Sequence, residues 1–237
     1  MTKTLLITGA SSGIGAATAR AAAEAGFHLA LSARRKDRLD DLVAEIGTER
    51  ALALPCDVAD YEAQERVVAD AVARFGRLDA VFANAGRGGA EGGFSSAPPE
   101  SWRDLVDTNI LGVAYTLRAS LGEIRKTRGH VVLTGSIAGR RALKGSMYSV
   151  TKWAVSGMGY NLREELRGTG ARVTLIEPGV VDTPFFDSPK PDGLRPDDVA
   201  NAVVYALTQP PHVDLHEMLI MPTPPENGEN TSGGPGL

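Results

Sequence analysis

The sequence predicts an α/β fold, a single doubly wound sheet of seven parallel strands with helices on both faces. Short apolar runs alternate with longer helical patterns along the 237 residues. The runs are almost continuously apolar, as expected for strands covered on both faces. A glycine-rich turn directly follows the first run. The expected strands are Thr4–Thr8, His28–Ser32, Ala51–Pro55, Leu78–Ala83, His130–Thr134, Arg172–Glu177 and Glu217–Met221.

Alanine-rich or amphipathic stretches between these runs predict the helices. Gly26 marks the end of the first helix, and Pro196 followed by two aspartates marks the start of the last one. This alternation gives βαβ units, which build one parallel sheet. The expected helices are Ile14–Ala25, Arg38–Ile46, Ala63–Phe75, Glu100–Arg125, Ser149–Arg167 and Pro196–Thr208.

We expect one catalytic domain over residues 1–222, because no linker divides the chain earlier. The proline-dense segment 183–196 follows the sixth strand, at the sheet edge where α/β proteins bind ligands. It is predicted to be a short substrate lid, with a plain connector as the alternative. Residues 223–237 are rich in proline, glycine and polar residues, and we expect a flexible C-terminal tail.

Composition excludes several classes of partner. The net charge is −4 without a basic run, so we expect no nucleic acid. No apolar stretch reaches the roughly 20 residues that span a bilayer, so no membrane is expected. The single Cys56 excludes an internal disulfide and fits a cytoplasmic protein, where it is expected to be a small core residue. No metal is expected.

The turn Thr8–Gly15 joins the first strand to the first helix and predicts a Rossmann-like dinucleotide site. Its first glycine permits the tight turn, its second lets the backbone approach a pyrophosphate, and its third allows close packing of helix and strand. Two serine hydroxyls add donors at a helix N-terminus, which favours anions. The predicted cofactor residues here are Gly9, Ser11, Ser12, Gly13, Ile14 and Gly15.

The residues after the second strand predict NADP(H) as the cofactor. Arg34 lies one residue past the position where an enzyme that prefers NAD carries a carboxylate, Arg35 follows it, and no acid precedes Asp37. A guanidinium binds a 2′-phosphate through charge-assisted hydrogen bonds. Arg34 is the stronger candidate, and Arg35 is expected beside the adenine or the phosphate. The alternative is that both arginines are a solvated helix start.

Two further strand ends supply candidates. Asp57 and Val58 follow the third strand, where the carboxylate is predicted to accept a hydrogen bond from the adenine amino group; the alternative is that Asp57 caps the next helix. Asn84, Ala85 and Gly86 follow the fourth strand. Gly86 would admit backbone close to the cofactor, and Asn84 would lock neighbouring strands.

Tyr148 and Lys152 are four residues apart and would share one face of a helix. A nearby ammonium favours phenolate, so we expect the pKa of Tyr148 to be lowered. Taken alone the pair is equally an ordinary helix pair. Together with the glycine-rich turn it predicts a hydride-transfer enzyme.

The combined motifs resemble the short-chain dehydrogenase/reductase family over residues 2–221. They are the glycine-rich turn, Asn84-Ala85-Gly86, Asn109, Ser136, Tyr148 with Lys152, and Pro178-Gly179. The segments at Ala33-Arg34-Arg35 and Leu215–Pro222 look like a bacterial NADP-dependent subgroup that acts on hydroxy acids, serine-like compounds or small aldehydes.

The resemblance implies a role for each catalytic residue. Tyr148 would donate a proton to the carbonyl oxygen or accept one from the alcohol, and Ser136 would polarise that oxygen. Lys152 would lower the pKa of Tyr148 and bind the nicotinamide ribose. Asn109 would hold a water that connects Lys152 to solvent.

The segment after the sixth strand is expected, by the same resemblance, to contact the nicotinamide end of the cofactor. Pro178 and Gly179 open this segment, and backbone at Val181 would bond the carboxamide. The Thr183 hydroxyl would reach the carboxamide or a phosphate, with a plain loop hydroxyl as its alternative.

The substrate pocket is predicted to be compact and partly apolar. Among the basic residues Arg140, Arg141 and Lys144, some would attract a carboxylate at its mouth, unless they form a solvated loop or a subunit contact. The predicted apolar lining is Phe94, Leu143, Met147, Phe185 and Phe186.

The sequence thus predicts an NADP(H)-dependent oxidoreductase that interconverts a carbonyl and an alcohol on a small molecule. An NAD-linked dehydrogenase and a non-catalytic NADP(H) sensor are the rival readings. Apolar residues such as Trp153 and Leu162 exceed what one sheet face needs, so a homo-oligomer is expected, and the resemblance implies a tetramer.

Overall fold

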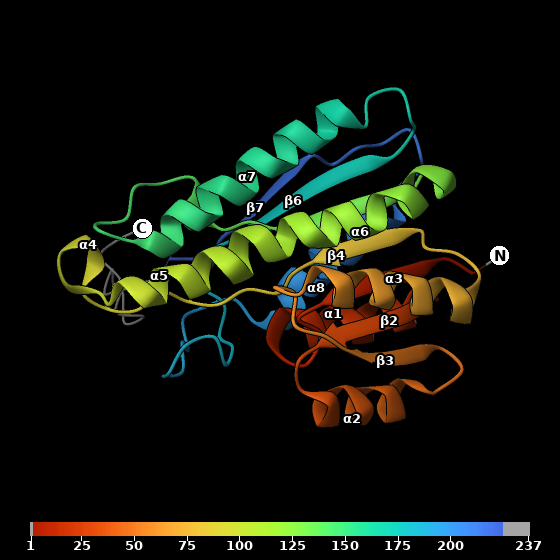
Figure 1. The fold of residues 1–237 in the computed structure, drawn as a ribbon, viewed down its shortest axis with the longest axis horizontal. Coiled ribbons are helices and arrows are strands. Elements are labelled where there is room, and N and C mark those ends of the chain that lie inside the picture. The colour runs from red at the N-terminus through yellow and green to blue at the C-terminus, as the bar shows by residue number, and fades with distance from the viewer. Residues whose placement is uncertain (1, 225–237) are drawn as a thin grey trace.

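A computed structural model describes residues 2–224 and confirms the predicted fold class. Seven parallel strands form one sheet in the order β3-β2-β1-β4-β5-β6-β7 (Figure 1). The order reverses direction between β1 and β4, which places the expected ligand crevice there. The strands are β1 (Thr4–Thr8), β2 (His28–Ala33), β3 (Ala51–Pro55), β4 (Ala80–Ala83), β5 (His130–Thr134), β6 (Arg172–Pro178) and β7 (Glu217–Ile220).

Helices cover both faces of this sheet, and most of the predicted tail, residues 225–237, lies outside the described residues. Side chains of α1, α2 and α8 pack on one face, and those of α3, α6 and α7 pack on the other. The helices are α1 (Gly13–Glu24), α2 (Lys36–Ile46), α3 (Tyr61–Phe75), α4 (Gly93–Ser96), α5 (Pro99–Val106), α6 (Gly112–Thr127), α7 (Met147–Glu165) and α8 (Pro196–Thr208).

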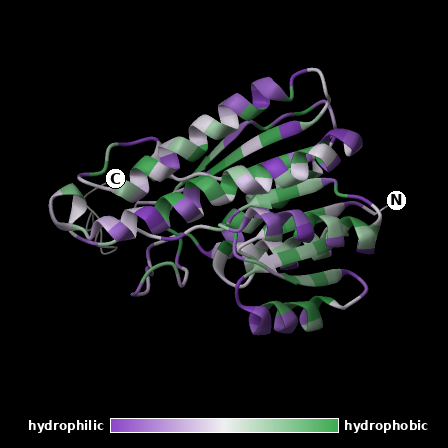
Figure 2. Cartoon of the chain, viewed as in Figure 1, coloured by the Kyte–Doolittle hydropathy of each residue, from purple (hydrophilic) through white to green (hydrophobic). Residues whose placement is uncertain are grey.

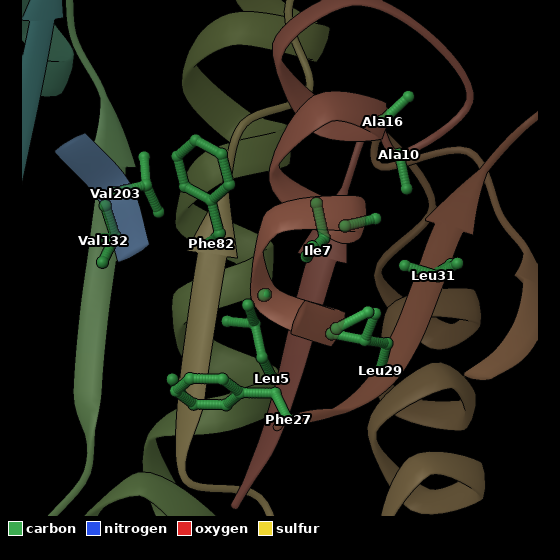
Figure 3. Close-up of a cluster of buried hydrophobic side chains, with 14 of the residues drawn as sticks. Leu5, Ile7, Ala10, Ala16, Phe27, Leu29, Leu31, Phe82, Val132 and Val203 are labelled. Carbon is green, nitrogen blue, oxygen red and sulfur yellow. The ribbon is translucent and has the colours of Figure 1, made fainter. Parts of the chain in front are cut away.

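The core on the α1 face shows how the strand residues are used. Leu5 and Ile7 of β1 point to that face, while Leu6 between them belongs to the core on the other face. Figure 3 shows Leu5, Ile7 and Phe82 side by side between the strands and α1. Because successive strand residues alternate between two buried faces, both must be apolar, which explains the continuous apolar runs.

The predicted helix Glu100–Arg125 is interrupted in the structure. A wide π-helical turn (Asp107–Leu111) separates α5 from α6, and Asn109 lies within it. The Asn109 side chain bonds to the backbone of a distant loop, so the insertion serves a tertiary contact. The residue spacing of this segment did not predict the π-helical turn.

Helix α7 begins two residues earlier than predicted, at Met147. Ser146 is its N-cap, and the Ser146 hydroxyl accepts a hydrogen bond from the Ser149 N–H at 3.1 Å. Tyr148 therefore lies in the first turn of α7, with Lys152 one turn further along.

Hydropathy follows this packing. Figure 2 shows mostly hydrophobic strands in the sheet and a hydrophilic outer side on α2. Within the part of the chain that the structure describes, no helix is long and apolar enough to cross a membrane.

Candidate active site

A cavity of about 510 Å³ lies at the carboxyl ends of the strands. Every predicted cofactor residue except Gly15 lines it, and so do Ser136, Tyr148 and Lys152 among the predicted catalytic residues. The structure therefore brings both halves of the sequence prediction into one space.

Two glycines of the turn have no room for a side chain. A Cβ added at Gly9, whose φ is +67°, would lie 2.9 Å from Cα of Ala85. A Cβ at Gly15 would lie 2.3 Å from the Gly9 carbonyl oxygen, which explains why Gly15 packs behind the cavity instead of lining it. Helix α1 starts at Gly13 and directs its first N–H groups toward the turn. This cradle fits the phosphates of a dinucleotide.

The two arginines after β2 are placed differently. The Arg34 side chain is 76% exposed, and its nearest acid is Asp57, 4.0 Å from Nη1 to Oδ2. Arg35 Nη2 donates to the Ser11 hydroxyl at 3.0 Å and to the Ser12 hydroxyl at 2.9 Å. Arg35 thus joins the end of β2 to the glycine turn, while Arg34 keeps most of its donors free for a ligand.

The alternative role for Asp57 as a helix cap is wrong. Asp60 is the N-cap of α3 and accepts from the Ala63 N–H at 3.0 Å. Asp57 instead accepts from the Ala59 N–H at 3.0 Å through Oδ1 and lines the cavity. Both Asp57 and Asp60 precede the helix in the sequence, so either could have been its N-cap, and the structure uses Asp60.

Asn84 locks neighbouring strands, as predicted. Its side-chain amide donates to the Thr8 carbonyl oxygen at 3.1 Å, and its side-chain oxygen accepts from the Thr134 hydroxyl at 3.1 Å. These bonds join the ends of β1, β4 and β5, the three strands beneath the centre of the cavity.

Tyr148, Ser136 and Lys152 form the reactive end. Lys152 is 5% exposed, its Nζ donates to the Thr134 carbonyl oxygen at 2.7 Å, and Nζ lies 5.8 Å from the centre of the Tyr148 ring. Burial lowers the pKa of Lys152 to about 8. Ser136 is buried, lines the cavity with Tyr148, and lowers the pKa of the Tyr148 phenol.

The predicted lowering of the Tyr148 pKa by Lys152 is wrong for this structure. Burial raises the pKa of Tyr148 to about 12, and the hydrogen bond with Ser136 acts in the opposite direction. Burial dominates because it penalises phenolate, while the Lys152 ammonium is directed to a carbonyl oxygen and is itself disfavoured by burial. Ser136, not Lys152, is the group that lowers the phenol pKa here.

Asn109 lies beside the cavity, not in its wall. Its amide donates to the Arg87 carbonyl oxygen at 3.0 Å and to the Thr151 hydroxyl at 3.1 Å, and its oxygen accepts from the Arg87 N–H at 2.9 Å. A Cβ at Gly86 would lie 3.4 Å from Asn109 Oδ1 and 3.8 Å from Lys152 Nζ. Asn109 therefore fixes the loop after β4 against α7. The water link to Lys152 stays a prediction.

The predicted substrate residues divide into two groups. Phe185 and Phe186 line the cavity, and the Phe185 ring lies 5.5 Å from the Tyr148 ring. Phe94 is 58% exposed and packs edge-on against Trp102, outside the cavity wall.

Leu143 and Met147 also lie outside the cavity wall. Their predicted placement, like that of Phe94, needs correction, because sequence proximity to Tyr148 does not fix the direction of a side chain. Arg140 does not face the mouth either, since it is paired with Glu177 and Glu217.

Several cavity residues carried no signal in the sequence. Arg87, Thr108 and Gly135 are adjacent in the chain to Gly86, Asn109 and Ser136, but they belong to no sequence motif of the site. Thr134 acts through its main-chain oxygen, which every residue type offers. The cavity wall that was not predicted comprises Ala33, Cys56, Arg87, Thr108, Thr134, Gly135 and Pro184.

The fold and this cavity are those of a doubly wound α/β protein whose glycine-rich turn could hold a dinucleotide. The family model described as short chain dehydrogenase matches residues 3–192. The chain therefore belongs to the short-chain dehydrogenase family.

Known relatives agree over nearly the whole chain. An uncharacterized oxidoreductase of Staphylococcus haemolyticus is 38% identical over 222 residues, 92% of this chain and 96% of that protein. Among solved structures, an alcohol dehydrogenase from the archaeon Thermococcus sibiricus complexed with 5-hydroxy-NADP has a TM-score of 0.86 and 34% identity, covering 92% of this chain and 96% of its own. Serine dehydrogenase from Escherichia coli has a TM-score of 0.83 and 32% identity, covering 91% and 96%.

Proposed function

We propose that this protein is an NADP(H)-dependent oxidoreductase that interconverts a carbonyl and an alcohol on a small substrate. The observation that carries the proposal is that Tyr148, Ser136 and Lys152 share one cavity with the glycine turn and the two arginines after β2. A cofactor held by that turn and a substrate held at Tyr148 would then meet inside the same cavity.

Each residue has a role that its placement supports. The bound cofactor supplies or accepts the hydride. Tyr148 donates the proton to the carbonyl oxygen in reduction, a step for which a phenol with a raised pKa is held in its protonated form. Ser136 hydrogen-bonds that oxygen and the phenol. Lys152 binds the ribose and, with a pKa near 8, is poised to return a proton to Tyr148 near neutral pH.

NADP(H) is the proposed cofactor because of charge. Arg34 is mostly exposed at the cavity edge, and no carboxylate stands at the end of β2 to accept a ribose hydroxyl. The Thermococcus sibiricus relative bound to 5-hydroxy-NADP supports this choice. An NAD-linked enzyme is the rival that the cofactor test decides.

The test is turnover with purified protein. NADPH and NADH are compared at equal concentration against aldehydes, ketones and keto acids. For the oxidative direction, NADP⁺ and NAD⁺ are compared with L-serine and small alcohols. We expect loss of NADPH absorbance with at least one carbonyl and weaker activity with NADH. No turnover with any of these compounds, or a preference for NADH, would contradict the proposal.

A homo-oligomer and a cytoplasmic location remain part of the proposal. Val150, Trp153 and Tyr160 form an exposed stripe along α7, at 44, 51 and 40% exposure. Leu162, which we had assigned to this face, is buried in the core instead. We expect a tetramer packed partly through this stripe, and a monomeric mass by light scattering would contradict it.

A further inference from the structure

A buried ion-pair cluster lies directly behind the Ser136 loop and has no part in the chemistry described above. Glu177, at the end of β6, is 1% exposed, and both of its carboxylate oxygens lie close to Arg140 Nε, at 2.8 and 2.7 Å. Arg140 also pairs through Nη2 with Glu217 of β7. The Ser156 hydroxyl of α7 donates to Glu177 at 3.0 Å. We call these four residues the Arg140 clamp.

The clamp encloses the loop that carries Ser136. Ser136 is followed by one 3₁₀ turn, Ile137–Gly139, and Arg140 comes directly after that turn. On the other side of Ser136, a Cβ added at Gly135 would lie only 2.8 Å from Glu177 Cγ. The Glu177 side chain therefore contacts the backbone just before Ser136 and binds the residue just beyond the turn.

The same loop is pressed against the catalytic helix. A Cβ at Gly139 would lie 2.6 Å from the Lys152 carbonyl oxygen and 3.1 Å from the Ser156 hydroxyl. The Ser149 hydroxyl donates to the Ala138 carbonyl oxygen at 2.6 Å. The clamp thus fixes the Ser136 loop, the helix that carries Tyr148 and Lys152, and the strand that leads to Pro178 and Gly179.

We infer that Arg140 and Glu177 are positioning residues that hold Ser136 in the cavity wall beside Tyr148. The inference rests on the proposed function. A buried ion pair is often no more stable than apolar side chains of the same volume, so stability alone does not explain it. Position explains it better, since a displacement of about 1 Å in an active site costs up to about 100-fold in rate.

A second ion pair supplies a matched control. Arg163 of α7 and Asp214, which precedes β7, are 3.1 Å apart, so this pair also joins α7 to the β7 region. Neither residue contacts the Ser136 loop or lines the cavity. Arg163→Met therefore removes a cross-element pair, more exposed than the clamp at 48% and 26%, without touching the active site.

The experiment compares Glu177→Gln, Arg140→Met, Arg140→Lys and Arg163→Met with the wild type, using the carbonyl substrate that the NADPH screen identifies. We expect Glu177→Gln and Arg140→Met to lower kcat by about 10- to 100-fold, with the Kd of NADPH near the wild-type value. Arg140→Lys should recover part of this loss, and Arg163→Met should keep wild-type kcat.

The pH profile gives a readout that a merely structural role would not move. Ser136 lowers the pKa of Tyr148, so a displaced Ser136 should raise that pKa. The rate of alcohol oxidation, which needs phenolate, should then fall at every pH below about 12, while the limb near pH 8 that Lys152 sets stays in place. If Arg140→Met does not fold, the folded Glu177→Gln and Arg140→Lys variants decide the question. Wild-type kcat and pH profile in folded Glu177→Gln, or an equal loss in Arg163→Met, would overturn the inference.

A spectroscopic measurement separates this inference from the proposed function. The ¹³Cζ chemical shift of Tyr148, assigned by its loss in Tyr148→Phe, reports the bond to Ser136 without turnover. We expect this shift to change in Glu177→Gln and to stay unchanged in Arg163→Met. Absent wild-type turnover would defeat only the proposed function, and an unmoved ¹³Cζ shift in Glu177→Gln would defeat only the clamp.

Discussion

The cofactor end and the reactive end of the cavity are built by different means. At the cofactor end, the glycine turn and the first N–H groups of α1 offer backbone, and contacts such as Gly9 against Ala85 leave no room for a Cβ at the glycines. At the reactive end, side chains from the loop after β5, from α7 and from the segment after β6 meet. They are Ser136, Tyr148 and Phe185.

This difference determines which amino-acid substitutions each end of the cavity tolerates. A backbone cradle depends on the absence of Cβ atoms, so almost any substitution of its glycines must fail. A side-chain constellation depends on supporting contacts, and its members can be changed one at a time. Substitutions that separate the two ends therefore test the comparison directly.

The largest expected effect is at the reactive end. Tyr148→Phe should lower kcat by about 10²- to 10⁴-fold, because the ring still packs but the proton donor is gone. The Kd of NADPH, measured by fluorescence titration, should stay near the wild-type value. Near-normal turnover would remove Tyr148 from the proposed mechanism.

At the cofactor end, Arg34→Ala should weaken NADPH binding by about 1.5–3 kcal/mol, the range for a hydrogen bond to a charged group, and leave NADH nearly unchanged. Arg35→Ala should weaken both cofactors, since Arg35 also orders the Ser11 and Ser12 hydroxyls. Arg38→Ala, which removes another exposed arginine from α2, is the control for net charge. Equal loss of both cofactors in Arg34→Ala would show that its role is structural.

The amino ends of the strands lie away from the cavity, so a substitution there should affect folding stability and neither cofactor nor substrate binding. His130 is 3% exposed, and burial lowers its pKa to about 3. The unfolded chain binds this proton below about pH 6.5, whereas the folded chain does not until about pH 3, so folding stability falls as the pH decreases through that window.

When the pH is lowered from 7 to 5, protonation of His130 in the unfolded chain should lower the free energy of unfolding of the wild type by about 2 kcal/mol. His130→Gln keeps a donor toward the Thr174 hydroxyl, which lies 2.7 Å from His130 Nε2, and should lose that much less over the same interval. Urea unfolding at both pH values measures the difference. Parallel losses in the two proteins would show that another group controls the acid limb.

The smallest expected effect concerns the lid. Phe185 is 40% exposed and packs against Tyr148, and a Cβ at Gly88 would lie 3.4 Å from its ring. Phe185→Ala should raise the KM of the carbonyl substrate by about fivefold, since part of one aromatic ring is lost from the contact surface. The Kd of NADPH should not change.

Phe94→Ala is the control for the lid, because Phe94 is exposed and lies outside the cavity. We expect wild-type KM in this variant. A KM change in Phe94→Ala without one in Phe185→Ala would reverse the assignment of the lid. We also expect residues 185–194 to be mobile in the absence of substrate, and slow hydrogen exchange there in the free enzyme would contradict this.

The sequence by itself determined the seven strands, the doubly wound sheet that they form and the glycine-rich turn after the first strand. Strands that are buried on both faces must be apolar along their whole length, so their positions can be read from the sequence. The positions that lack a Cβ, Gly9 and Gly13, are likewise given directly by the residue type. Tyr148 and Lys152 were found because four residues make about one helical turn.

Only the tertiary structure decided the pKa values, the ion-pair partners and the side-chain directions around those residues. Burial raises the Tyr148 pKa against the expected influence of Lys152, and Arg140 turns inward to Glu177 instead of facing a substrate. Phe94 and Leu143 lie outside the cavity although they are near catalytic motifs in the chain. Burial, side-chain direction and long-range pairing depend on which distant segments meet, and local residue patterns do not contain that information.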